Sequence, residues 1–102
     1  MCPKSNWFAT IVLSYNHPEH TGRAVRSALR LIPQQAILLV HNGSEDRHSA
    51  RLIREFPQIG HLQIPINKGY SGGVNAGLRE VFAQGFAWAL LLTNDCELID
   101  FL

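Results

Sequence analysis

The sequence lacks the features that mark several common protein classes. Its 102 residues include 2 cysteines, Cys2 and Cys96, near opposite ends of the chain. Two thiols without paired spacing build neither a disulfide framework nor a zinc ribbon, so reduced thiols are expected. No apolar run approaches the roughly 20 residues that cross a bilayer, and "MCPKSNWF" has neither the basic start nor the long apolar stretch of a secretory signal. We therefore expect a cytoplasmic domain with no membrane segment of its own.

A strong charge of one sign is also missing. The formal net charge of +1 gives no long-range field that would attract nucleic acid or an anionic membrane. Arg23, Arg26 and Arg30 share a helical spacing, which a solvated helix face explains. With 46% apolar and 17% charged residues, the chain is too apolar for intrinsic disorder. Its length fits one core, so we expect a single domain over residues 1–102 and no nucleic-acid partner.

What the sequence does contain is an alternation of apolar segments and amphipathic helices. Short apolar runs predict strands at 8–13, 36–40, 61–66 and 86–92. Pro65 removes a ladder donor from the third run, which favours a sheet edge. The fourth run, "FAWALLL", is apolar at every position, which is typical of a strand covered on both faces.

Three helices are predicted between these strands. The first begins at Pro18, with Asn16 or His17 as its cap, and the second begins at Ser44 or Asp46 and stops at Pro57. A glycine-rich turn at 67–73 precedes the third, which Gly85 ends. The inward-facing positions of the second and third helices are predicted at Leu52, Ile53, Phe56, Val74, Leu78, Val81 and Phe82.

The order β-α-β-α-β-α-β predicts an α/β fold: a Rossmann-like parallel sheet of about four strands with helices on both faces. In such a sheet the loops that leave the carboxyl ends of the strands meet at one edge, where ligands bind. These loops are "SYN" (14–16), "HNGS" (41–44), "NKGYSGG" (67–73) and "TNDCE" (93–97). The polar, glycine-rich and carboxylate-bearing stretches are therefore expected together.

The four loops, with the strands before them, resemble one enzyme family. "IVLSYN", "ILLVHNGSED", "NKGYSGGVNAGL" and "LLLTNDCEL" occur in unbroken order, and together they resemble the nucleotide-binding part of inverting family-two glycosyltransferases of the GT-A fold. Their rhamnosyltransferase-like branch is the most similar. The resemblance implies that the chain is the N-terminal, donor-binding half of a catalytic domain.

The resemblance also implies which residues contact the donor. Asp95 is the expected ligand of Mg²⁺ or Mn²⁺, because a cation shared with the diphosphate lowers the cost of its departure. Tyr15 is expected beside the base, and the glycine run leads into a helix whose first N–H groups face the nucleotide. The expected nucleotide-binding residues are Ser14, Tyr15, Asn16, His41, Asn42, Asn67, Gly69, Gly72, Gly73, Asn75 and Asn94.

Two positions depart from the pattern of the family. Where the family usually has an aspartate that bonds the base imide, we identify His41, which supplies no fixed negative acceptor. In place of D-x-D the chain has Thr93-Asn94-Asp95, so only the second carboxylate is present. Phosphates and waters would then supply most of the metal's ligands.

The expected activity of the parent enzyme is transfer of a sugar from a UDP- or dTDP-linked donor to a glycan or lipid-linked acceptor, with inversion. The general base is expected beyond residue 102, so the isolated chain is predicted to be inactive. The alternatives are a non-catalytic nucleotide- or protein-binding module, and a nucleotidyltransferase built on a related sheet. An unpaired edge of the strand at 86–92 would also allow a homo-oligomer.

Overall fold

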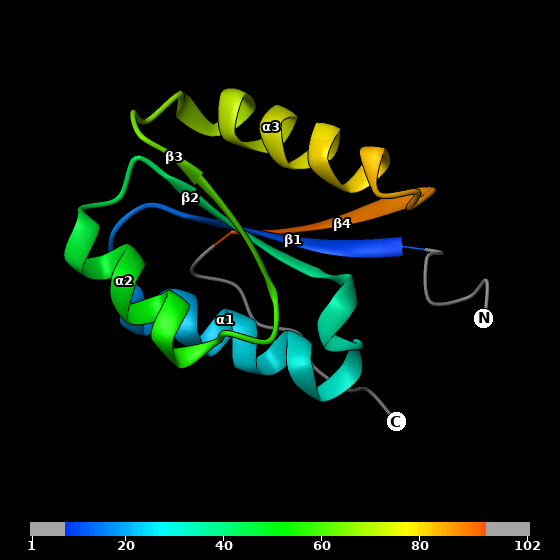
Figure 1. Ribbon diagram of the computed structural model, residues 1–102, viewed down its shortest axis with the longest axis horizontal. Coiled ribbons are helices and arrows are strands. Elements are labelled where there is room, and N and C mark those ends of the chain that lie inside the picture. Colours follow the sequence, from blue (N-terminus) through cyan, green and yellow to red (C-terminus); the bar gives the residue numbers. More distant parts are fainter. Residues whose placement is uncertain (1–7, 94–102) are drawn as a thin grey trace.

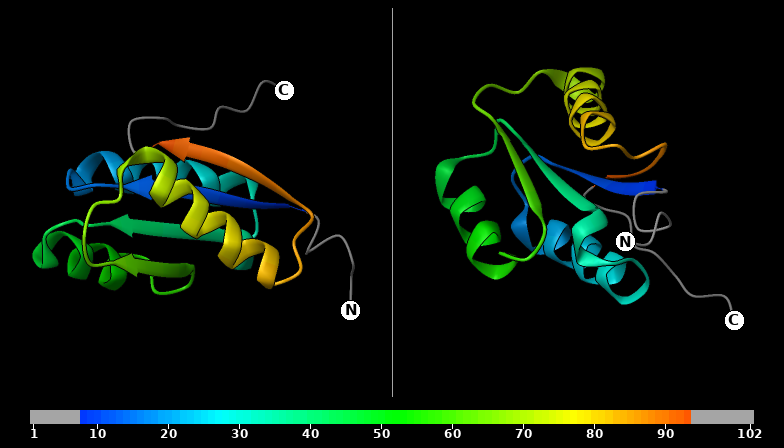
Figure 2. Two further views of the ribbon diagram at one scale, coloured as in Figure 1. Left: turned by 90° about the horizontal axis from the view of Figure 1, so that it is seen from above. Right: turned by 45° about the vertical axis from the view of Figure 1, so that its right-hand side comes forward.

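A four-stranded parallel sheet forms the centre of the protein, of which the computed structural model describes residues 8–93. The sheet order is β3-β2-β1-β4, and every neighbouring pair is parallel. All four arrows point the same way in the left view of Figure 2. The predicted α/β class and element order are confirmed.

The elements are β1 (Phe8–Ser14), α1 (Pro18–Leu31), the 3₁₀ turn η2 (Gln34–Ala36), β2 (Ile37–Asn42), α2 (Asp46–Glu55), β3 (Gly60–Ile64), α3 (Gly69–Ala83) and β4 (Trp88–Thr93).

Helices cover both faces of the sheet, as predicted. Helices α1 and α2 lie on one face and α3 on the other (Figure 1). The close packing of α3 on the sheet requires glycine at position 77, because a Cβ there would lie 3.0 Å from Ile11 Cγ2 and 3.1 Å from Val40 Cγ2. The helix therefore packs directly on the two central strands. None of the helices in residues 8–93 is long and apolar enough to cross a membrane.

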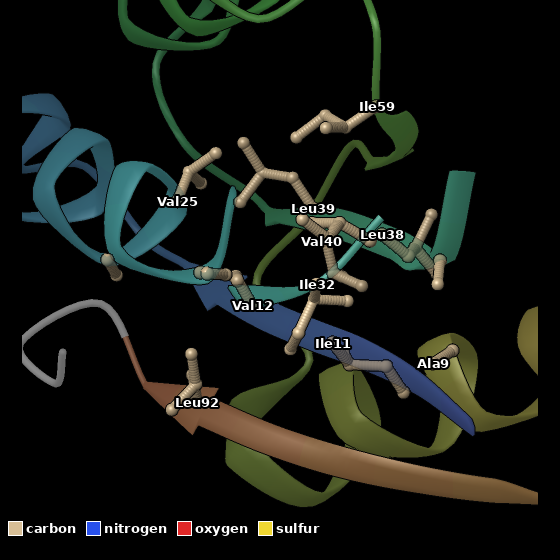
Figure 3. Close-up of a cluster of buried hydrophobic side chains, with 14 of the residues drawn as sticks. Ala9, Ile11, Val12, Val25, Ile32, Leu38, Leu39, Val40, Ile59 and Leu92 are labelled. Carbon is tan, nitrogen blue, oxygen red and sulfur yellow. The ribbon is translucent and has the colours of Figure 1, made fainter. Parts of the chain in front are cut away.

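The core is centred on β1 and β2, the two inner strands. Ile11, Val12, Leu39 and Val40 are fully buried, two on each strand. Figure 3 shows them with Val25 from α1 in one apolar cluster. Adjacent residues point to opposite faces, and both faces are covered, so the strands are apolar at successive positions.

The two outer strands differ in how the predictions turn out. β3 lies at an edge, as the proline at position 65 indicated. The expectation that residues 86–92 are covered on both faces is wrong for the described chain. Trp88 is 67% exposed, and Leu90 and Leu91 are each 38% exposed. The reason is position, because β4 is an outer strand that pairs with β1 alone within residues 8–93, and α1 and α3 contact it less than they contact β1.

The helix starts were predicted in part, because one of the two predicted cap positions of α1 is correct and both of those for α2 are wrong. The N-cap of α1 is His17, but its side chain makes no capping bond and its backbone is left-handed with φ 49°. The N-cap of α2 is Glu45 in place of Ser44 or Asp46. The predicted glycine-rich turn is mostly helix, because α3 begins at Gly69.

The helix ends and inward faces were predicted better. Gly85 follows α3 with φ 98°, a conformation that favours glycine. Leu52, Phe56, Val74 and Val81 are buried as expected, and Ile53 and Leu78 are half-buried. Phe82 is 49% exposed, so its assignment to the inward stripe is wrong.

Candidate functional site

Asn16 joins the loop after β1 to the loop after β2. Its backbone N–H donates to Ser44 Oγ at 2.8 Å, and its side-chain Oδ1 accepts from the Glu45 N–H at 3.0 Å. Asn16 has a left-handed backbone with φ 54°, which asparagine tolerates better than most residues. The neighbouring Tyr15 is left 48% exposed at the edge of the sheet.

Asn42, the last residue of β2, holds the loop before α3. Its Nδ2 donates to the Gly69 carbonyl at 3.0 Å, and its Oδ1 accepts from the Lys68 N–H at 3.1 Å. Within that loop, Asn67 Oδ1 accepts from the Gly69 N–H at 2.7 Å. Gly43 allows the loop after β2 to approach the loop before α3, because its φ is 78° and a Cβ there would lie 2.2 Å from the Asn67 nitrogen. The second and third loops are thus packed backbone against backbone.

These contacts leave a hollow of about 260 Å³ at the carboxyl edge of the sheet, which we name the Tyr15 hollow. It lies where β1, β2 and β4 end and where α3 begins, so it combines an aromatic ring, amide groups and a helix N-terminus. The residues that line it are Leu13, Tyr15, Asn42, Asn67, Gly69, Tyr70 and Thr93.

His41 lies on the opposite face of β2 and does not join the Tyr15 hollow. It is 1% exposed, and its Nε2 lies 2.9 Å from His61 Nδ1. His61 Nε2 lies 2.7 Å from the Phe56 carbonyl, which can only accept. His61 therefore carries its proton on Nε2 and accepts the Nε2–H of His41 on Nδ1.

This arrangement makes His41 a neutral residue with one free acceptor. Its Nδ1 is buried and has no hydrogen-bond partner in the part of the chain that the structure describes. Burial, followed by the charge effect of His61, lowers the pKa of His41 to about 4. A second hollow of about 390 Å³, the His41 hollow, lies between β2, α2 and β3 and includes Asp46, Ser49 and Gln63 in its lining.

The other sequence-predicted residues divide between packing and exposure. Ser14 is buried and shares a hydrogen bond of 3.0 Å with Thr21 on α1. A Cβ at Gly73 would lie 2.7 Å from both Asn42 Nδ2 and Leu13 Cδ1, so this glycine allows helix packing. A Cβ at Gly72 would lie 2.6 Å from Lys68 Cβ.

Of the remaining predicted residues, one lies away from the Tyr15 hollow and two fall outside the part of the chain that the structure describes. Asn75 is exposed on α3. Asn94 and Asp95 lie outside the described residues. No group of three or more potential metal ligands occurs within residues 8–93.

Three residues that line the hollow were not among the predicted donor-binding residues. They are Leu13, Tyr70 and Thr93, and the signal for Tyr70 was an aromatic residue inside a glycine-rich run. The hydrogen bonds that Asn42 makes to the loop also leave no trace in residue type or spacing.

The sequence model of glycosyl transferase family 2 matches residues 10–100. The chain belongs to this family. A search of curated proteins found no match. The match begins within β1 and runs past the end of β4, so the matched range includes all three loops around the Tyr15 hollow and also Asp95. Membership supports glycosyl transfer as the general activity, with a nucleotide-sugar donor and an acceptor.

Proposed function

We propose that the Tyr15 hollow binds the nucleoside diphosphate of a sugar donor and that the parent enzyme transfers the sugar to an acceptor hydroxyl with inversion. The observation that carries this proposal is the meeting of three loops and a helix N-terminus at one hollow on the carboxyl edge of the sheet. The rhamnosyltransferase-like motifs favour a UDP- or dTDP-linked donor and a glycan or lipid-linked acceptor.

Each part of the hollow suits one part of the donor. The exposed ring of Tyr15 offers a face on which a nucleobase stacks. The first N–H groups of α3 lack partners within the helix, and they carry the positive end of its dipole. Gly69 and Tyr70 bring this helix start into the hollow, where it would face the diphosphate.

Asp95 is the proposed metal ligand. Thr93, the last residue of β4, lines the hollow, and Asp95 follows it by two residues. The family generally uses divalent cations. The carboxylate of Asp95 and the amide oxygen of Asn94 are hard donors that fit Mg²⁺ or Mn²⁺, whereas the Cys96 thiol does not. When bound, the ion neutralises charge on the departing diphosphate.

The acceptor hydroxyl must lose a proton during inverting transfer. We expect the general base from a segment that follows the metal motif, so the donor-binding half alone should bind nucleotide without transferring sugar. The predicted base contact of His41 remains a prediction, and its burial against His61 argues against it.

Calorimetric titration with UDP, with and without Mn²⁺, tests the proposal. Binding should be tighter with the metal, and Asp95→Asn should remove most of that gain, about 10- to 100-fold or on the order of 1.4 to 3 kcal/mol. Asp46→Asn is the matched control, because Asp46 lines the His41 hollow. Binding that ignores both the metal and the Asp95 substitution would contradict the metal assignment.

The outer edge of β4, which pairs with no strand within residues 8–93, supports a separate proposal, self-association through strand pairing. The strand reads "WALLLT" and has no charged residue or proline of the kind that blocks edge pairing. Light scattering at increasing concentration should show dimers that Trp88→Lys abolishes. Gln63→Lys on the opposite edge strand is the control. A wild-type protein that stays monomeric at high concentration would refute this proposal.

A further inference from the structure

The side-chain amide of Asn42 is engaged at both ends by the loop before α3. Its nitrogen donates to the Gly69 carbonyl at 3.0 Å, and its oxygen accepts from the Lys68 N–H at 3.1 Å. The residue is 3% exposed, so it presents little surface to a ligand. A buried amide without hydrogen-bond partners would destabilise the fold. The two bonds therefore favour the orientation in which Asn42 contacts Lys68 and Gly69.

The two residues that Asn42 holds are the start of helix α3. Lys68 is the N-cap and Gly69 is the first helical residue. No side chain caps the helix from the Lys68 position. Asn67 holds the Gly69 N–H from within the loop, and Asn42 is the side chain that ties this helix start to β2. The close contact between Gly43 and the Asn67 backbone reinforces the same alignment.

We propose that Asn42 is a positioning residue that aims the N-terminus of α3 at the diphosphate, and that it does not read the base. The inference rests on the proposed function, because it assigns the diphosphate to the start of α3. Without Asn42 the start of α3 would lose its two hydrogen bonds to β2, so its first N–H groups would no longer be held in one direction. Loss of Asn42 should then weaken binding of phosphates and spare binding of the nucleoside.

Titrations of wild type and Asn42→Leu with uridine and with UDP, at one Mn²⁺ concentration, separate these roles. Leucine has a similar shape and keeps the site filled. The gain in affinity from uridine to UDP should fall about tenfold in the variant, comparable to the loss of one charge-assisted hydrogen bond. Uridine affinity should change less than about twofold, which is a small effect on this scale.

Ser44→Ala is the matched control. Ser44 Oγ accepts from the Asn16 N–H, so the variant removes one interloop hydrogen bond at the same sheet edge but away from α3. Its gain from uridine to UDP should equal that of wild type. An equal loss in both variants, or a loss of uridine binding in Asn42→Leu, would overturn the positioning role.

Amide hydrogen exchange of wild type gives a test that needs no variant. The Lys68 N–H should keep or increase its protection when UDP binds, because Asn42 stays on the loop. Loss of that protection would mean that Asn42 turns to the ligand, which overturns the inference but not the proposed function. Failure of wild type to bind any nucleotide would overturn both.

Discussion

The two sides of the sheet's carboxyl edge use polar residues in opposite ways. On the α1 and α2 side, Ser14 bonds to Thr21 and His41 bonds to His61, so these side chains bond to one another within the protein. On the α3 side, Asn42 bonds to a loop backbone and borders the Tyr15 hollow. His41 and Asn42 are neighbours in the sequence, yet they serve different sides.

The difference shows how strand geometry divides one motif. Successive side chains of a strand point to opposite faces, so adjacent polar residues at a strand end cannot both reach the same hollow. We call the α1 and α2 side the closed side, because its polar side chains bond to one another and contribute stability, although the His41 hollow adjoins them. The α3 side is the open side, because it presents the exposed ring of Tyr15 to a ligand. The predictions below test this division, from the largest expected effect to the smallest.

Gly43→Ala should have the largest effect, because it drives the two loops apart. A Cβ there would lie 2.2 Å from a backbone nitrogen, at φ 78°. Overpacking and left-handed strain together predict a loss of about 3 kcal/mol or more in the free energy of unfolding, measured by urea denaturation. Gly69→Ala is the control, with φ 74° and no atom within 4 Å, and should cost only about 1 kcal/mol. Equal losses would show that the close approach contributes nothing.

Tyr15→Ala should weaken nucleotide binding and leave stability nearly unchanged. Stacking of a base on an aromatic ring is worth about 1 to 3 kcal/mol, so the Kd for UDP should rise about tenfold or more. Phe82→Ala is the matched control, since Phe82 is 49% exposed, against 48% for Tyr15, and does not line the hollow. If both variants bind UDP as wild type does, the open side of the edge is not the base site.

The pH dependence of stability should report on the closed side. The folded pKa of His41 is about 4, below its ordinary value of 6.5, so between these values the unfolded chain takes up a proton that the folded chain does not. The contribution of His41 to the free energy of unfolding should be fully present above pH 6.5 and should be lost as the pH falls from 6.5 towards 4. The slope for one proton is at most about 1.4 kcal/mol per pH unit. His61 from β3 and Asp46 from α2 are the titratable groups nearest this site.

His41→Leu should remove this part of the slope, as followed by thermal unfolding across the pH range. The same variant should leave the relative affinities for UDP and ADP unchanged. His20→Gln is the control, because His20 is exposed and stacks on His17 away from β2. An altered base preference in His41→Leu would instead support the base contact predicted from the sequence.

The sequence predicts the sheet well because apolar runs and loop residues both depend on local pattern. The parallel order and the edge position of β3 follow from such patterns, and from the proline at position 65. The exposure of β4 does not, because composition cannot reveal how many neighbours a strand has. The cap of α2 was predicted wrongly for a related reason, because Ser44 Oγ accepts from the Asn16 N–H in the loop after β1 and does not cap the helix.

The site is predicted in part. Tyr15, Asn67 and Gly69 line the hollow, because each follows a strand end that the pattern locates. Gly73 has a different reason to be glycine, which only the distance to Asn42 and Leu13 reveals. The burial of His41 likewise depends on its partner, His61, which lies 20 residues away on another strand.

The sheet register has a consequence for the order in which the protein can fold during synthesis. β1 is an inner strand, and its two neighbours are β2 and β4, with Phe8 opposite Trp88. The second row of backbone hydrogen bonds of β1 therefore forms only after β4, the last described strand, has been made. Closing so long a segment is slow and exposes strand edges meanwhile. Until β4 has been made, that edge of β1 has no partner strand among the described elements.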